Sequence, residues 1–396
     1  MENYAHIAAN IRRYRQAAGL TQASLAARSG RSVPCIKKLE SGKHMPETST
    51  LTAVSQALGV SIFDLVLQAE PIDSVRFRAR KSVLSECDRS IILIEVSRWL
   101  HEYAFLEEAA GAVSRLNRAP FAHLRSPEKL AVRFREVFGI DPTVPIYDPC
   151  SVLERTGIKV LFYEHRTPGM NRHNSPAETG SSKNPANVRC RGSRYGFSGL
   201  SVCDERCGEA IIVNGSRGIS TEHKIFTAFH ELGHLLMHLT DYNSDLKEED
   251  PEEEAQADAF ASFLLMPRGA FRSMWSATRG NPLLDRVFRT KQYFRVSYRT
   301  VLKRLADEKL APENIWLTFA QTYKRVSGKN LQGYREPFAL EPEMLNRYEF
   351  CDDRFTRLVF DAGIREKITV SKGAELLRIP VTEFRDRLWS DLGGRR

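Results

Sequence analysis

The chain has 396 residues, of which 42% are hydrophobic, and it carries a formal net charge of +9 at pH 7. Its length allows about two or three globular domains, and its basic surplus favours a polyanionic partner such as DNA, the alternative being a generally basic surface. No apolar run approaches the ~20 residues of a membrane span, the first residues lack the pattern of a signal peptide, and the cysteines are scattered, so we expect a cytoplasmic protein with no membrane partner.

The first expected domain is a bundle of five short helices within residues 1–68. Glycine, proline and capping residues divide the apolar pattern into segments 5–18, 22–28, 32–39, 49–58 and 61–66. One face of each segment contributes to a single small core. The expected core residues are Ile7, Ile11, Leu25, Ala26, Ile36, Leu39, Leu51, Val54, Leu58, Val60 and Leu65.

This segment resembles the XRE-type, lambda-repressor-like helix-turn-helix. The matching motifs are Gly19-Leu20-Thr21-Gln22, Leu25-Ala26, Ile36-x-x-Leu39-Glu40-x-Gly42 and Ala57-Leu58-Gly59-Val60. The resemblance implies that the third helix enters the major groove of an operator duplex, and that the protein binds there as a homodimer. A bundle that has lost DNA binding, or that binds protein, is the alternative.

The residues expected to contact DNA lie on and beside the third helix. Lys38 can donate to a guanine, and Val33 can contact a thymine methyl group. Pro34 fits a helix only in its first turn, which is where the segment places it. The expected DNA-binding set is Gln22, Val33, Pro34 and Lys38 near base edges, with Arg31, Lys37 and Lys43 near phosphates.

Residues 69–118 are expected to form a linker followed by a helical brace. Glu70-Pro71 opens the linker, and a basic run follows at 75–81. Apolar residues at helical spacing predict a long helix over 85–110, which serves as a brace or a dimer surface. We assign the basic run to a solvated face, with DNA contact as the alternative.

Residues 119–310 are expected to form one domain with a small sheet. Helices are predicted from Pro127 to Phe138 and between Pro145 and Thr156, and strands at 158–163, 197–202 and 209–214. An edge strand of such a sheet can hold an extended peptide by main-chain pairing.

A candidate metal site lies in the run His230-Glu231-Leu232-Gly233-His234. The flanking residues contain no proline and are apolar at helical spacing, so His230 and His234 are expected one turn apart on one helix face. Two imidazoles so placed can bind one zinc ion, and Glu231 can reach a water on that ion. Gly233 leaves room for another segment to approach.

A second predicted helix, stopped by Pro267, supplies a third ligand after an acidic, loop-like stretch at 246–254. Glu254 and Asp258 share a face of this helix because they are four residues apart. Two histidines, Glu254 and an open fourth position are typical of a catalytic zinc site, with manganese as the alternative ion. Asp258 can hold a ligand histidine by its other ring nitrogen.

The HELGH motif, the LLMH that ends its helix and the run E-x-x-x-D-A-F-A-x-x-L-L-M-P resemble the ImmA/IrrE metallopeptidases, over roughly residues 120–310. The resemblance implies a gluzincin-like peptidase that inactivates helix-turn-helix repressors. It implies that His230, His234 and Glu254 are ligands and that Glu231 is the general base. The chain departs from the family at Asp258, where members often have Asn, and in a polar insertion at 165–194.

Other residues near the motif receive weaker assignments. His238 is expected to have turned away from the metal, since a helix drifts about 40° over four residues. Tyr195 and His223 are candidates for stabilising an oxyanion. Cys203 and Cys207 lack a second Cys/His pair, so no structural zinc is expected there.

Residues 311–396 are expected to be helical. The segment 296–305 and the pair of short helices expected over 368–388, around Ile379-Pro380, each resemble part of a helix-turn-helix. We expect packing or oligomer elements, with DNA binding as the alternative.

The whole sequence therefore predicts a mostly helical α+β protein: a DNA-binding regulator with a zinc peptidase that cleaves a helix-turn-helix repressor or the chain itself, for example within the linker at 70–81. The alternative is a repressor whose zinc-site domain is a non-catalytic sensor or a dimerisation scaffold. Glu231 favours the peptidase because a site that only binds metal does not need that carboxylate.

Overall fold

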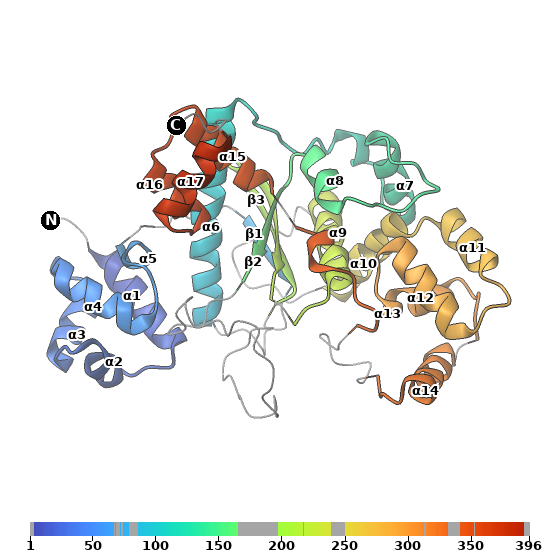
Figure 1. Cartoon of the computed structure of the whole chain (residues 1–396), viewed down its shortest axis with the longest axis horizontal. Coiled ribbons are helices and arrows are strands. Elements are labelled where there is room, and N and C mark those ends of the chain that lie inside the picture. Colours follow the sequence, from blue (N-terminus) through green and yellow to red (C-terminus); the bar gives the residue numbers. More distant parts are fainter. Residues whose placement is uncertain are drawn as a thin grey trace. The chain divides into compact units, whose positions relative to one another are not determined.

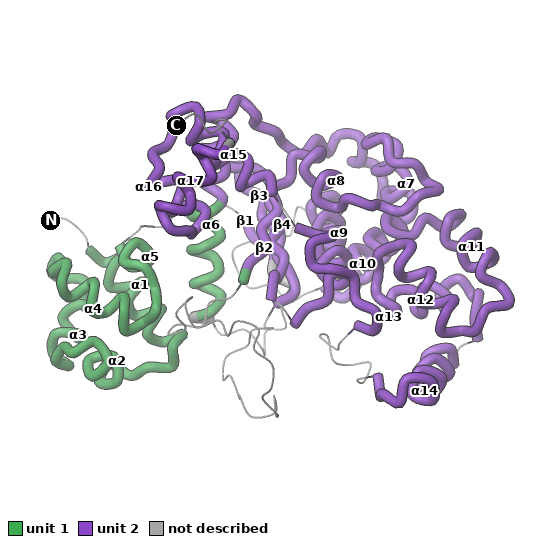
Figure 2. The backbone as a smooth tube through the Cα atoms, in the orientation of Figure 1, with its two compact units in different colours: residues 1–71, 79–99, 164–196 green, residues 72–78, 100–163, 197–396 purple. Residues whose placement is uncertain are grey.

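The computed structural model describes residues 4–66, 68, 72, 74–78, 86–164, 197–216, 218–238, 250–312, 314–331, 341–351 and 353–391. The chain divides into two compact units, coloured separately in Figure 2. The first unit contains residues 1–71, 79–99 and 164–196, and the second contains 72–78, 100–163 and 197–396.

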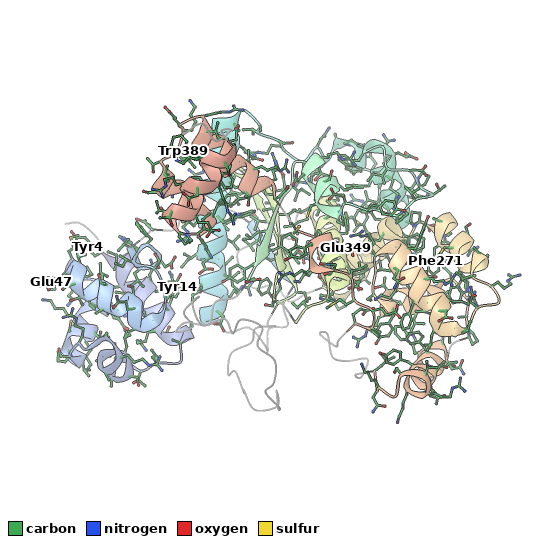
Figure 3. All side chains as sticks on the ribbon, in the orientation of Figure 1. Tyr4, Tyr14, Glu47, Phe271, Glu349 and Trp389 are labelled. Atoms are coloured by element: carbon green, nitrogen blue, oxygen red, sulfur yellow. The ribbon has the colours of Figure 1, made fainter. Side chains whose placement is uncertain are left out.

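The first unit contains the expected five-helix bundle. Thr21 and Ser32 cap the second and third helices by accepting hydrogen bonds from the backbone N–H groups of Ser24 and Cys35. Buried apolar side chains from the helices form one core, which includes Tyr14, labelled in Figure 3. The helices are α1 (Ala5–Ala17), α2 (Gln22–Ser29), α3 (Val33–Glu40), α4 (Thr48–Leu58) and α5 (Ile62–Val66).

The long helix α6 (Glu86–Ala110) is shared between the two units. In the first unit, Ile91 joins the core of the bundle and Arg98 forms an ion pair of 2.8 Å with Asp64 of α5. In the second unit, Glu107 is fully buried and forms an ion pair of 2.9 Å with Lys159. The helix expected over 85–110 is thus present as one continuous element from Glu86 to Ala110, and its role as a brace stays a prediction.

The second unit contains a four-stranded sheet (Figure 1). Its strands are hydrogen-bonded in the order β1-β3-β4-β2. The strands are β1 (Ser74–Arg78), β2 (Lys159–Tyr163), β3 (Gly199–Asp204) and β4 (Gly208–Asn214). β3 pairs antiparallel with both β1 and β4, and β2 pairs parallel with β4. β1 lies within the expected linker, so the expectation of a basic run without regular structure was wrong for residues 74–78. Apolar Val75 and Phe77 alternate with Arg76 and Arg78, which is the two-residue period of a strand, but the arginines gave this run the composition of a solvated linker.

Two helices carry the candidate metal residues. α9 (Thr221–Met237) packs against β3 and β4, and α10 (Pro251–Leu265) packs against α9 and α7 (Pro127–Val137). Phe271, labelled in Figure 3, is among the buried residues of this core. The remaining elements of this part are η1 (Ala119–Phe121), α8 (Pro149–Arg155), α11 (Arg268–Ala277), α12 (Leu283–Phe294), α13 (Tyr298–Asp307) and α14 (Ile315–Ser327).

The C-terminal region is helical, as expected. After η4 (Arg347–Glu349), the helices α15 (Arg354–Ile364), α16 (Val370–Leu377) and α17 (Val381–Asp391) pack on one another. Gly373 is required here, because a Cβ atom at this position would lie 2.2 Å from the Phe384 ring. None of the helices in the described ranges is long and apolar enough to span a membrane.

Candidate metal centre and nucleic-acid interface

Helix α9 brings the motif residues into the interior. Its first turn is capped by Ser220, whose side chain accepts a hydrogen bond from the His223 N–H. His230, Glu231 and His234 are all buried, with exposed fractions of 0%, 0% and 1%. Burial of three polar side chains on one helix is costly unless each has a specific partner.

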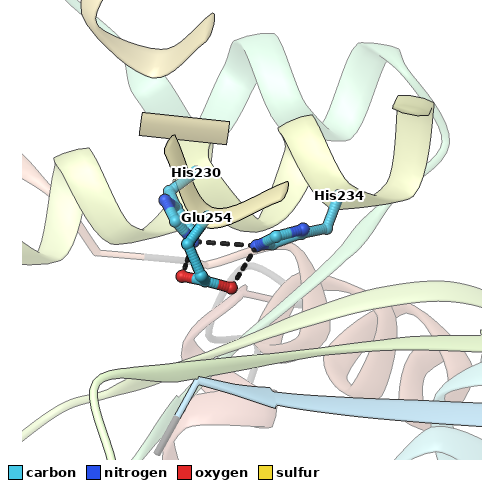
Figure 4. A group of neighbouring side chains, drawn as sticks. All are labelled: His230, His234 and Glu254. Carbon is cyan, nitrogen blue, oxygen red and sulfur yellow. Dashed lines mark hydrogen bonds and ion pairs between the residues drawn. The ribbon is translucent and has the colours of Figure 1, made fainter. Parts of the chain in front are cut away.

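His230, His234 and Glu254 converge on one point (Figure 4). The Nε2 atoms of the two histidines lie 2.9 Å apart. Glu254 of α10 places Oε2 at 3.2 Å from His230 Nε2 and Oε1 at 3.0 Å from His234 Nε2. The spacing on two helices therefore produces the three-residue cluster that the sequence indicated.

The other ring nitrogen of each histidine is held by a neighbour. Asp258 Oδ1 lies 2.8 Å from His230 Nδ1, in the position expected for it. His238 Nδ1 lies 2.9 Å from His234 Nδ1, and His238 Nε2 lies 3.1 Å from Gln256 Oε1. Among the described residues His238 does not belong to the ligand cluster; one turn beyond His234, it contacts the outer nitrogen of that ring, a contact that the helical spacing alone did not predict.

The electrostatic environment suits cation binding. Burial lowers the pKa of His234 to about 3, so its ring is neutral and its lone pair can bind a metal. Burial raises the pKa of Glu254, but hydrogen bonds with His230 and His234 outweigh this and hold it well below its usual range. The cluster therefore offers the neutral ring of His234, the Nε2 atom of His230 and one carboxylate.

This donor set fits zinc. Zinc–nitrogen bonds of ~2.0–2.1 Å in a tetrahedral site separate the ligand atoms by roughly 3.3 Å. The separations of 2.9–3.2 Å among the three donors are close to that spacing. Asp258 and His238 on the outer nitrogens complete the arrangement usual for metal-binding histidines.

Glu231 is positioned by the sheet. Ser201 of β3 donates a hydrogen bond of 2.8 Å to Glu231 Oε2. Next to it, a Cβ atom added at Gly199 would lie 3.1 Å from Glu231 Oε1 and 2.6 Å from Thr227 Cγ2, so glycine makes room for the carboxylate. Neither residue was identified from the sequence, where both lay in an ordinary predicted strand.

Gly233 is the point at which the two ligand helices meet. A Cβ atom at Gly233 would lie 3.2 Å from Ala257 Cα and 3.1 Å from the Phe260 ring of α10. The close approach expected at Gly233 therefore comes from α10, and it brings Glu254 within reach of both histidines.

The acidic stretch before Glu254 is only partly a loop. Asp250 caps α10 by accepting from the Glu252 N–H, and Glu252, Glu253 and Glu254 form its first helical turn. The expectation of a loop was therefore wrong for residues 251–253, because acidic side chains stabilise the positive N-terminal end of a helix, whereas Glu254 is helical as expected. Residues 246–249 lie outside the described residues.

Three assignments near the site stay predictions. Tyr195 and the insertion at 165–194 lie outside the described residues. His223 is half-buried on α9, seven residues before His230 and hence on the same side of the helix.

The candidate DNA-reading surface lies on α3. Pro34 is in its first turn, and Val33 is 36% exposed. Lys37, Lys38 and the following Lys43 are exposed as well. These five residues are available to a partner, as expected for a recognition helix and its flank.

Gln22 and Arg31 are half-buried and also have structural roles. Gln22 donates a hydrogen bond of 2.8 Å to the buried Glu40 carboxylate, which accepts further hydrogen bonds from Arg15. Arg31 donates to the Ser49 carbonyl at 3.0 Å. The sequence did not reveal that these two residues help to join the helices of the bundle.

Comparisons with known proteins match both parts of the chain. Residues 11–65 match the model of the helix-turn-helix family, and residues 197–306 match that of the IrrE N-terminal-like domain, of the M78 peptidases. The uncharacterized HTH-type transcriptional regulator y4dJ of Sinorhizobium fredii is 40% identical over 74 residues, which are 19% of this chain and 92% of the relative.

Proposed function

We propose that this chain, which belongs to the HTH-type transcriptional regulators, is a DNA-binding regulator with a zinc-dependent peptidase of narrow specificity. The proposal follows from its two parts, because the chain joins a helix-turn-helix domain to an IrrE N-terminal-like domain. The resident ion would be Zn²⁺, held by His230, His234 and Glu254, with Mn²⁺ as the alternative.

One observation carries the catalytic part of this proposal. Glu231 is completely buried, follows the first histidine directly and is oriented by Ser201. A site that only binds or senses a metal does not require a carboxylate at this position, and burying a charge there is costly. This supports a peptidase over the non-catalytic sensor or the dimerisation scaffold.

Each residue then has a definite task in peptide hydrolysis. Bound zinc would supply a Lewis acid that polarises the peptide carbonyl and lowers the pKa of a water to ~7. Glu231 accepts a proton from the attacking water at its carboxylate, as the new C–O bond forms. It then passes the proton to the leaving amine as the C–N bond breaks. Asp258 and His238 keep the two histidine rings in their orientations.

The substrate that we propose is a helix-turn-helix protein, either a separate repressor or this chain. Linking a peptidase to a DNA-binding domain gives it a high local concentration of proteins at the same operator. Self-cleavage within residues 70–81 meets an obstacle in the structure: Ser74–Arg78 form β1, so a cut there requires this strand to leave β3.

The DNA-binding part is proposed to act as a homodimer on a pseudo-palindromic operator, with half-sites about one helical turn apart. The exposed Val33, Lys37 and Lys38 on α3 support DNA reading by this helix.

The test is to incubate wild type and Glu231→Gln with zinc and operator DNA, together with co-expressed candidate repressors, and to map fragments by mass spectrometry. We expect cleavage within a repressor helix, or at residues 70–81, that is absent from Glu231→Gln. Equal cleavage by both proteins would remove the peptidase assignment, and indiscriminate digestion of casein alone would indicate a housekeeping protease.

A further inference from the structure

Strand β1 forms one edge of the sheet beside the metal centre. It consists of five residues, Ser74–Arg78, and among the strands of the described residues its one partner is β3. In the register of this pair, Arg76 lies opposite Ser201. Ser201 is the residue that donates to Glu231, so β1 runs directly beside the strand that orients the proposed general base.

The side chain of Arg76 reaches the metal centre itself. It forms an ion pair with Glu253, and its Nη2 atom lies 3.4 Å from Oε1 of Glu254, the proposed ligand. Only 12% of the Arg76 side chain is exposed. A guanidinium buried to this degree against two carboxylates indicates a specific contact rather than a surface ion pair.

The two contacts follow from one geometric relation. Residues that lie opposite each other on antiparallel strands project to the same face of the sheet. Arg76 and Ser201 therefore share the face against which α9 packs, and they reach Glu254 and Glu231 respectively. An extended chain along the outer edge of β3 thus places a side chain next to both the proposed base and a proposed ligand.

A peptide that binds by strand addition would occupy that position. We propose that the outer edge of β3 is the peptide-binding site, that Glu253 and Glu254 favour an arginine or lysine in the peptide, and that β1 is its intramolecular occupant, which excludes other peptides. The inference rests on the proposed function, and it deepens it in two ways. It assigns a substrate class, extended basic segments of the kind that DNA-binding proteins contain, and it assigns a mechanism of autoinhibition.

Displacement of β1 is physically reasonable. An edge strand is held by one ladder of hydrogen bonds, and another chain can replace it by strand addition. As a tethered segment, β1 competes at an effective concentration on the order of millimolar. A free peptide at micromolar concentration therefore cannot displace it unless the Arg76 contacts are weakened.

The experiment uses the full chain with Glu231→Gln, so that no peptide is cut. Arg76→Glu is added to repel β1 from Glu253 and Glu254, and Arg76→Ala serves as a milder variant if the first does not fold. Arg133→Glu is the matched control, because it makes the same charge change at a side chain 48% exposed on α7. The probe is a fluorescein-labelled peptide of residues 72–80, IDSVRFRAR, followed by fluorescence anisotropy.

We expect the Arg76 variants to bind this peptide at least ~10-fold more tightly than the parent chain or the Arg133 control. A peptide carrying the Arg76→Glu change should bind none of them. Hydrogen exchange at residues 199–204 should accelerate in the Arg76 variants and return to the parent rate when peptide is added. Unchanged exchange together with unchanged peptide affinity would show that β1 is a permanent strand and overturn the proposal. Peptide affinity and hydrogen exchange require no cleavage, so they test the role of β1 independently of the peptidase assignment. The peptidase assignment is tested separately, and it is wrong if Glu231→Gln cleaves like wild type.

Discussion

Ser201 on β3 and Glu231 on α9 are joined by a hydrogen bond of 2.8 Å between two fully buried side chains. The bond couples the central sheet to the helix that carries the metal residues, and it fixes the carboxylate in a single orientation. The first prediction concerns this contact.

Ser201→Ala is expected to lower the kcat of peptide cleavage by about 10- to 100-fold, because a hydrogen bond to a charged group contributes roughly 1.5–3 kcal/mol. KM and zinc content should remain at wild-type values, since Ser201 is not among the proposed ligands. Ser201→Thr keeps the hydroxyl and should restore much of the rate. A proportional loss of zinc in Ser201→Ala would assign Ser201 to metal binding instead.

Gly199→Ala tests the space beside the same carboxylate. The added methyl group would lie 2.6 Å from Thr227 and 3.1 Å from Glu231 Oε1, so α9 or β3 must shift. We expect a loss of stability of about 1–3 kcal/mol, typical of overpacking, together with reduced cleavage. Thermal unfolding checks the first effect. The double variant Gly199→Ala/Thr227→Ser should recover part of the stability, and no recovery would place the clash elsewhere.

The metal residues can be separated by their zinc content. His230→Ala should lose the ion, while Glu231→Gln should retain one zinc per chain, measured by elemental analysis after gel filtration. Asp258→Ala should weaken zinc binding by about 10- to 100-fold, because it removes the partner of the His230 outer nitrogen. Asp258→Asn keeps an acceptor oxygen and should bind zinc nearly as well as wild type. Equal zinc affinity of wild type, Asp258→Ala and Asp258→Asn would exclude a role of Asp258 in metal binding.

The DNA-binding residues should divide into two classes. Lys38→Ala is expected to weaken the free energy of binding to the preferred operator by about 1–3 kcal/mol and to relax base preference at one position. Lys43→Ala should weaken binding to all sequences alike and reduce the slope of log K against log salt by roughly one. Titrations on specific and scrambled duplexes at several salt concentrations measure both effects. Gln22 is a poorer probe, because its replacement also removes a hydrogen bond to Glu40.

A pH effect on stability is expected from Glu341. Burial raises its pKa to about 7, although Lys291 lies 3.2 Å away and opposes the shift. Because the folded pKa is above the unfolded value, the folded protein holds an extra proton between about pH 4.5 and 7, and the free energy of unfolding falls as pH rises through this range. In Glu341→Gln, the decrease in the free energy of unfolding between about pH 4.5 and 7 should be smaller by about 2–3 kcal/mol. Glu343→Gln, an exposed neighbour, is the control, and an unchanged slope in Glu341→Gln would assign the effect to other groups.

Much of the fold could be predicted because its signals are local. Capping residues such as Ser32 and glycines such as Gly59 mark helix ends within a few residues, and the helical spacing of His230 and His234 fixes their common face. β1 could not be predicted, because a five-residue strand depends on a partner about 120 residues away and its arginines resemble a solvated linker.

The same limit applied to the site. The spacing of four residues places His230 with His234 and Glu254 with Asp258 on common helix faces. Sequence spacing was therefore sufficient to predict these four residues of the site. Ser201 and Arg76 reach the site through the register of a sheet, which no periodicity reveals. Helical drift keeps His238 out of the ligand cluster among the described residues, but its contact with the outer nitrogen of His234 depends on side-chain orientation, which sequence spacing does not reveal.

The first two turns of α10 connect almost every part of the centre. Within six residues, Glu253 contacts Arg76, Glu254 contacts both histidines, Gln256 contacts His238 and Asp258 contacts His230. Rotation of this helix by one residue, about 100°, would break all of these contacts together. Double-mutant cycles between any two of them should therefore show strong coupling. Assembly of the centre is then a cooperative, switch-like property of a single helix position rather than a sum of independent parts.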